Sequence, residues 1–196
     1  MTLRRFDGPV DGQSVLRTEL GKRILHTTGF ITPLGGAPQS GSPIPVFYLK
    51  LIDLQKNNPL ECAVQIGWQY PILGGVEPGL ASIKSFTDGR ASSFEGLSHG
   101  LLAKRFLQAS ILADNKLGAD AQVFEPRLLD CPALQYAALW LFGPKNFFVP
   151  LLDGKPPGTG PLNITPDITA DLRRRALSRS VNSAPAGGSA PISPSN

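Results

Sequence analysis

The stretch that decides the fold is residues 46–69, which read VFYLKLIDLQKNNPLECAVQIGWQ. On both sides of the cluster QKNNP, at residues 55–59, the side chains follow a period of two. Such a period is typical of a strand that has one face in the core, and a cluster of Asn and Pro favours a turn. The segment therefore predicts a β-hairpin, with Cys62 on the same apolar face as Trp68.

Working outward, three other segments predict strands because they are rich in β-branched or other apolar residues. These segments are residues 23–32, 122–129 and 147–152. The last two contain Pro126 and Pro150, and proline cannot donate a hydrogen bond to a neighbouring strand. We therefore expect these two segments to lie at sheet edges or to be bent.

Three segments predict helices. Residues 98–115 carry apolar side chains at helical spacing, with Ser98 as the cap or, alternatively, a capping box that begins at Ser92. The segment PALQYAALWLF, which opens at Cys131–Pro132, is apolar nearly all round and predicts a buried helix. Residues 165–178 begin with Thr-Pro-Asp, which favours a helix start.

These patterns together predict an α+β fold. We expect a mainly antiparallel sheet of about four to five strands, packed against two or three helices, because hairpin signals outnumber strand–helix–strand alternation. The tail is rich in Ser, Pro, Gly and Ala, and such a composition cannot offset the entropy of ordering. The predicted organisation is an N-terminal arm (1–22), a single globular domain (23–152), a linker with an Arg-rich helix (153–179) and a disordered tail (180–196).

Composition narrows the class of protein. The 196 residues include 21 Gly and 19 Pro, which predicts many turns between short elements. The net charge of +4 comes from scattered basic pairs, which gives no positive signal for a nucleic-acid surface. Two cysteines are too few for a disulfide scaffold. No apolar run approaches the roughly 18 residues that span a bilayer, so we expect a cytoplasmic protein with free thiols and no membrane partner.

The chain carries none of the motifs that mark phosphate loops, nucleophile elbows or compact zinc modules. A zinc site would need every histidine and cysteine of the chain, at a spacing unlike known modules. We therefore expect no metal and no cofactor. The catalytic candidates are His99, as a general base at a helix start, with Cys62, Cys131 or a carboxylate as its partner. The competing interpretation makes His99 a surface residue and both cysteines small buried hydrophobes.

The densest basic cluster is Arg173, Arg174 and Arg175, followed by Arg179. One interpretation is an interaction site for phosphate or an acidic partner. Another is a solvated amphipathic helix, because acidic residues precede the arginines at a spacing that stabilises a helix. The narrow apolar stripe of this helix could also dock on a partner.

Three functional hypotheses follow. The first is an interaction or accessory protein, such as a component of a larger assembly, that binds a protein partner or self-associates into an oligomer. The second is a small hydrolase or transferase that uses His99 with a thiol or a carboxylate. The third is a protein that binds nucleic acid or phosphate through the helix of Arg173–Arg175. Whether the chain is an enzyme stays open at this point.

Overall fold

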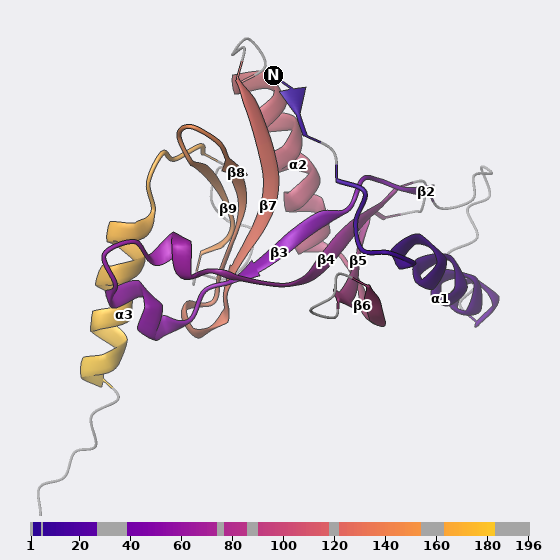
Figure 1. The fold of residues 1–196 in the computed structure, drawn as a ribbon, viewed down its shortest axis with the longest axis horizontal. Coiled ribbons are helices and arrows are strands. Elements are labelled where there is room, and N and C mark those ends of the chain that lie inside the picture. The colour runs from indigo at the N-terminus through magenta and orange to yellow at the C-terminus, as the bar shows by residue number, and fades with distance from the viewer. Residues whose placement is uncertain are drawn as a thin grey trace, which may run out of the picture.

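The computed structural model describes residues 2–4, 6–26, 39–73, 77–85, 90–117, 122–153 and 163–182. The described helices are α1 (Gly12–His26), α2 (Leu101–Leu117) and α3 (Thr169–Asn182), with the short 3₁₀ helices η2 (Leu51–Gln55), η3 (Pro59–Cys62) and η4 (Pro132–Leu134). The described strands are β1 (Thr2–Leu3), β2 (Gln39–Ser40), β3 (Ile44–Tyr48), β4 (Val64–Leu73), β5 (Gly79–Ser85), β6 (Ala91–His99), β7 (Val123–Cys131), β8 (Tyr136–Phe142) and β9 (Phe147–Asp153). The fold is α+β, as the sequence predicts (Figure 1).

The described strands form one sheet of nine, in which seven follow the order β6-β5-β4-β3-β7-β8-β9. The short strands β1 and β2 add to β7 and β4. Only the pairs β3–β7 and β1–β7 are parallel, and the other pairs are antiparallel. The mainly antiparallel sheet is therefore confirmed, but the prediction of about four to five strands was too small.

The predicted hairpin is the pair β3–β4, and its connection is larger than expected. Tyr48 pairs with Val64 and Ile44 with Gln69, with a bulge between Val46 and Phe47. Between the two strands lie η2 and η3, in place of a tight turn at residues 55–59. Cys62 therefore belongs to η3 and does not extend the apolar face of the strand.

The sheet is covered on both faces (Figure 1). Helix α2 contacts β5, β6, β8 and β9, so it covers one face. On the opposite face α3 lies against η2 and η4 at one end, and α1 lies against β5 and β6 at the other. Three buried apolar clusters correspond to these three helices, around Phe106 under α2, Leu172 under α3 and Leu16 under α1.

The segment that follows Cys131–Pro132 is a strand, so the helix predicted there is wrong. Every residue of β8 except Phe142 is buried. Leu139 and Leu141 join the cluster under α2, whereas Ala138 and Trp140 join the cluster under α3. A strand with both faces in the core is apolar at every position, so its sequence has no period that separates it from a buried helix.

Two other predictions of secondary structure need correction near the ends of helices. Residues 23–26 form the last turn of α1 and not a strand, and residues 27–32 lie outside the described residues. Ser98 and His99 end strand β6, and α2 begins only at Leu101, after Gly100 with a φ of 89°. Neither Ser98 nor a capping box at Ser92 therefore starts this helix.

The N-terminal arm and the C-terminal segment are more ordered than the sequence suggests. Helix α1 occupies the second half of the predicted arm and packs through Leu16 and Leu20. Helix α3 begins at Thr169, after Asp167, and continues to Asn182, past the predicted end at Ser178. The rest of the predicted disordered tail, from residue 183, and most of the predicted linker, residues 154–162, lie outside the described residues.

The two prolines predicted to mark edge strands have different outcomes. Pro150 lies on β9, which ends the strand order, as expected. Pro126 lies on β7, which is central: β8 pairs along one side, and the other side is shared by β1 and β3. Strand β1 pairs at residues 123 and 124, and β3 pairs from 128 to 130. Pro126 falls between these two partners, where neither strand needs its missing N–H.

Candidate functional site

The structure does not bring the predicted catalytic residues together. His99 is exposed at the end of β6, Cys131 is fully buried at the end of β7, and Cys62 lies in η3, where its thiol contacts the carbonyl oxygen of Asn58 at 3.8 Å. Three strands separate β6 from β7, which amounts to about 19 Å along the sheet. A thiol–imidazole pair is therefore absent among these three residues.

One carboxylate does lie near His99. Glu77 forms an ion pair of 2.9 Å with Lys104, and both partners are about half exposed. The hydrogen bond from Lys104 lowers the pKa of Glu77, and the charge of His99 adds a smaller effect. The group lies on the surface, and neither of the two cavities described below is lined by it.

The environment of the two cysteines predicts different reactivities. Burial raises the pKa of the Cys131 thiol, and its side chain has no solvent-exposed surface. Because the thiolate is the reactive form, we expect a thiol reagent such as Ellman's reagent to modify Cys62 in the native protein and to spare Cys131. Absorbance should report about one reactive thiol before denaturation and two after it. If Cys62→Ser still reacts fully in its native state, Cys131 is accessible and this packing is wrong.

The arginines of α3 mainly hold the chain together. The Arg173 guanidinium donates to the carbonyl oxygens of Leu54, at 2.9 Å, and of Asn57, at 2.7 Å, at the end of η2. Arg175 bridges Asp153 and Asp171 at 2.5 and 2.6 Å. These contacts engage two of the four arginines that the sequence marks as an interaction site.

Arg174 and Arg179 are the exposed members of the cluster, although Arg174 is paired with Asp171. The apolar stripe of the same helix consists of Ile168, Leu172 and Ala176, and all three residues are buried against the rest of the chain. The stripe therefore docks within its own molecule, an outcome that was not among the interpretations of the sequence, which had left open that the stripe docks on a partner.

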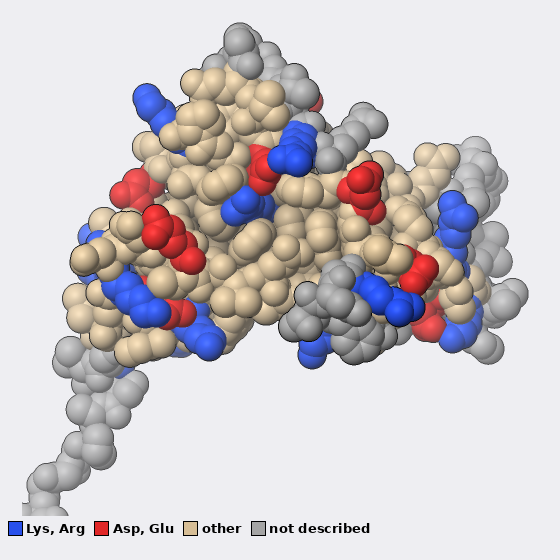
Figure 2. Space-filling view, viewed as in Figure 1, with Lys and Arg blue, Asp and Glu red and all other residues tan. Residues whose placement is uncertain are grey.

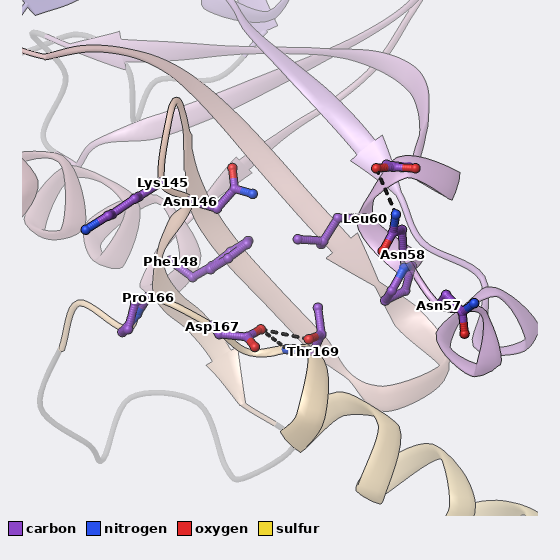
Figure 3. Close-up of a pocket in the computed structure, with 11 residues that line it drawn as sticks. Asn57, Asn58, Leu60, Lys145, Asn146, Phe148, Pro166, Asp167 and Thr169 are labelled. Carbon is purple, nitrogen blue, oxygen red and sulfur yellow. Dashed lines mark hydrogen bonds between the residues drawn. The ribbon is translucent and has the colours of Figure 1, made fainter.

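A cavity of about 430 Å³ lies between η3, the β8–β9 turn and the start of α3 (Figure 3). Its polar groups are largely bonded to one another: Asn58 donates to Glu61 at 3.1 Å, and Asp167 accepts from the backbone N–H and hydroxyl of Thr169. Figure 3 shows the side chain of Lys145 directed away from the cavity. Because its polar atoms are largely bonded to one another and the Lys145 side chain is directed outward, this cavity presents few hydrogen-bonding groups to a ligand.

The most distinctive surface lies on the sheet face opposite α2, between α1 and α3. Register pairs place its side chains on one side of the sheet: Phe47 with Gln65, Arg127 with Trp140, and Pro45 with Trp68. The final member, Phe142, pairs with Glu125. We call this surface the aromatic face and define it by Phe47, Gln65, Trp68, Arg127 and Phe142.

Arg127 is the centre of the aromatic face. Its guanidinium carbon lies 3.6 Å from the ring centroid of Phe142, 4.7 Å from that of Phe47 and 5.0 Å from that of Trp140. Cation–π attraction favours this arrangement, and the stacked rings fix the guanidinium in one orientation. The rings also exclude water, so the charge of Arg127 acts in a poorly screened environment.

A small ion network borders Arg127. The carboxylate of Glu125 accepts from Arg127 at 2.9 Å and from Arg4 at 2.6 Å, and these bonds, that of Arg127 above all, lower the pKa of Glu125. Two guanidinium groups thus share one carboxylate, which leaves a surplus of one positive charge. Around this network the surface is mostly uncharged, as Figure 2 shows between α3 and α1.

The aromatic face is only partly covered. Phe142 is 37% exposed, Gln65 is exposed, and Phe47 and Trp68 are half-buried. Sequence reasoning missed the site because residues 132–142 were interpreted as a helix. One signal was available in the sequence. Glu125, Arg127 and Leu129 are alternate residues of one predicted strand, so they share a face of it, and that face carries two charged side chains.

The fold and the site together define an α+β protein whose mixed sheet presents an aromatic, arginine-centred surface. Comparison with protein-family models, with curated proteins and with solved structures finds no match for the chain. Within the part of the chain that the structure describes, no helix is long and apolar enough to cross a membrane. The same residues contain no group of three or more side chains placed to hold a metal ion.

Proposed function

We propose that this protein is a non-enzymatic interaction protein that binds a protein partner through the aromatic face. The observation that carries the proposal is the guanidinium of Arg127, held among Phe47, Trp140 and Phe142 on a half-exposed, mostly uncharged surface. Aromatic residues and arginine are the side chains most enriched at the energetic centres of protein interfaces. A guanidinium that is already fixed loses little entropy when a partner binds.

The charge of the aromatic face suggests the chemistry of its partner. Glu125 divides its negative charge between Arg127 and Arg4, so the charge of Arg127 is only partly neutralised, and a carboxylate brought to Arg127 from the aromatic face would be stabilised. The partner surface is therefore apolar with one acidic side chain near its centre. A charge pair of this kind contributes to the choice of partner as much as to affinity.

Charge substitutions at Gln65 test the proposal, with Gln108 as a matched control. Gln65 is exposed on the aromatic face, and Gln108 is exposed on α2, which covers the other face of the sheet. Gln65→Lys should strengthen binding of the acidic partner and Gln65→Glu should weaken it. Each substitution should change the binding free energy by ~1 kcal/mol, which is about a fivefold change in the dissociation constant. The measurement is the amount of each protein that co-purifies with the tagged full chain, including second copies of the chain.

The same two substitutions at Gln108 should leave the recovered proteins unchanged. The proposal fails if no protein, and no second copy, responds in opposite directions to the two charges at Gln65. It also fails if the Gln108 variants produce the same changes, because the effect would then come from net charge alone.

A further inference from the structure

We infer that a second cavity, beside Pro126, binds a small apolar molecule that carries one carboxylate. This cavity has a volume of about 560 Å³ and lies between α2 and the sheet, on the face opposite the aromatic face. Phe106 of α2 and Leu139 and Leu141 of β8 form its inner wall. Its volume is in the range of pockets that enclose small organic ligands.

The cavity exists because β7 changes partners at Pro126. Strand β1 pairs up to residue 124 and β3 pairs from residue 128, so the sheet is open beside the proline. Pro43 and Pro71 stand with Pro126 in the wall. None of the three carries an N–H, so this wall has few backbone donors that an apolar ligand would leave unsatisfied.

Two polar groups of the lining are already bonded within the chain. The carbonyl oxygen of Pro71 accepts from the backbone N–H of Gly41 at 2.7 Å, and the hydroxyl of Ser110 donates to the carbonyl oxygen of Phe106 at 2.9 Å. Apolar side chains dominate the rest of the described lining. A sugar or another polyhydroxylated ligand would therefore lose its hydrogen bonds to water without replacing them.

The charged groups of the described lining are Arg4 and Asp114. Arg4 binds Glu125 through one guanidinium nitrogen, and Glu125 is shared with Arg127. The remaining N–H groups of the Arg4 guanidinium can donate to a carboxylate, which a guanidinium binds in a planar geometry with two hydrogen bonds. Asp114, on the α2 side, repels further negative charge, so a single carboxylate fits better than a phosphate.

Titration calorimetry with decanoate and decanol, on the full chain and below the micelle-forming concentration, tests the inference. Decanoate should bind saturably at one site per chain, and about tenfold more tightly than decanol, since the two ligands differ only in the head group. Arg4→Gln should remove this difference. Arg4 is 64% exposed, so its loss should leave the fold intact.

Two phenylalanine variants on α2 localise the binding. Ser110→Phe places a ring in the cavity and should abolish binding, whereas Gln108→Phe on the exposed side of the same helix should not change it. Gln65→Glu should also leave decanoate binding unchanged, which separates this site from the aromatic face. The inference is overturned if decanoate does not saturate, if decanol binds equally well, or if folded Ser110→Phe binds like the parent. If Ser110→Phe does not fold, the Arg4→Gln result decides alone.

Discussion

Replacing Leu172 with aspartate is expected to lower the free energy of unfolding by about 4 kcal/mol or more. The side chain has no exposed surface and packs in the cluster that includes Leu54 and Trp140. An aspartate there would bury a carboxylate among apolar groups, and such changes are among the most destabilising single substitutions. Urea unfolding followed by tryptophan fluorescence reports the effect, because Trp140 lies in the same cluster.

Leu177→Asp provides the matched control on the same helix. Leu177 is 60% exposed, so the same chemical change should alter the free energy of unfolding by less than about 0.5 kcal/mol. Equal effects at the two positions would mean that α3 is docked in another orientation. An unchanged urea midpoint for Leu172→Asp would mean that the helix is an appendage, and that its apolar stripe is available to a partner after all.

Replacing Gly67 with alanine is expected to cost about 2–3 kcal/mol, because the added methyl group meets backbone and not a side chain. A Cβ atom at this position would lie 2.7 Å from the carbonyl oxygen of Ile83 and 3.5 Å from the Cα of Lys84. Both belong to β5, so the contact can be relieved only by separating β4 from β5. Thermal unfolding followed by circular dichroism measures the loss.

Gly96 supplies the comparison. It lies in β6, which pairs with β5 on the side away from β4. A Cβ atom there would meet nothing within 4 Å. Gly96→Ala should therefore be neutral, or slightly stabilising by about 0.5 kcal/mol because alanine restricts the unfolded chain. If Gly67→Ala were as stable as Gly96→Ala, the close approach of β4 and β5 described here would be incorrect.

The elements that the sequence predicts well are those with a single clear period. The period of two on both sides of residues 55–59 predicts the hairpin, and residues 46–48 and 64–69 do lie on the paired strands β3 and β4. Residues 147–152 contain a proline compatible with an edge, and β9 is an edge. Helix α2 shows apolar residues at helical spacing, and only its first residues were misplaced, because β6 runs directly into the turn at Gly100.

The elements that the sequence misses lack that period for physical reasons. Strand β8 is buried on both faces, so every position is apolar. Among the side chains of helix α1 that the structure describes, Leu16 and Leu20 are buried against the sheet and Val15 is partly buried, which is a narrow stripe to recognise. Strands β5 and β6 contain serine and glycine at many positions, and their partners impose the extended conformation.

The aromatic face was beyond prediction for a different reason. It depends on the parallel pairing of β3 with β7, which joins Phe47 to the strand of Arg127 across a long stretch of sequence. The sequence of β3 does not indicate that β7 is its partner, and the sequence of β7 does not indicate β3. The sequence carries no recognisable catalytic motif, and its densest basic cluster directed attention to the arginines of α3. Two of these, Arg173 and Arg175, are engaged in contacts within the chain.

The central claim is that the aromatic face is a binding surface, and site-specific photocrosslinking tests it most directly. A benzophenone amino acid would replace Gln65 in one full-length variant and Gln108 in another, and both would be irradiated in the cells that produce the protein. We expect a discrete adduct from position 65 that is lost when Arg127→Ala is added, and no such adduct from position 108. The absence of any adduct from position 65, or the same adducts from both positions, would contradict the account.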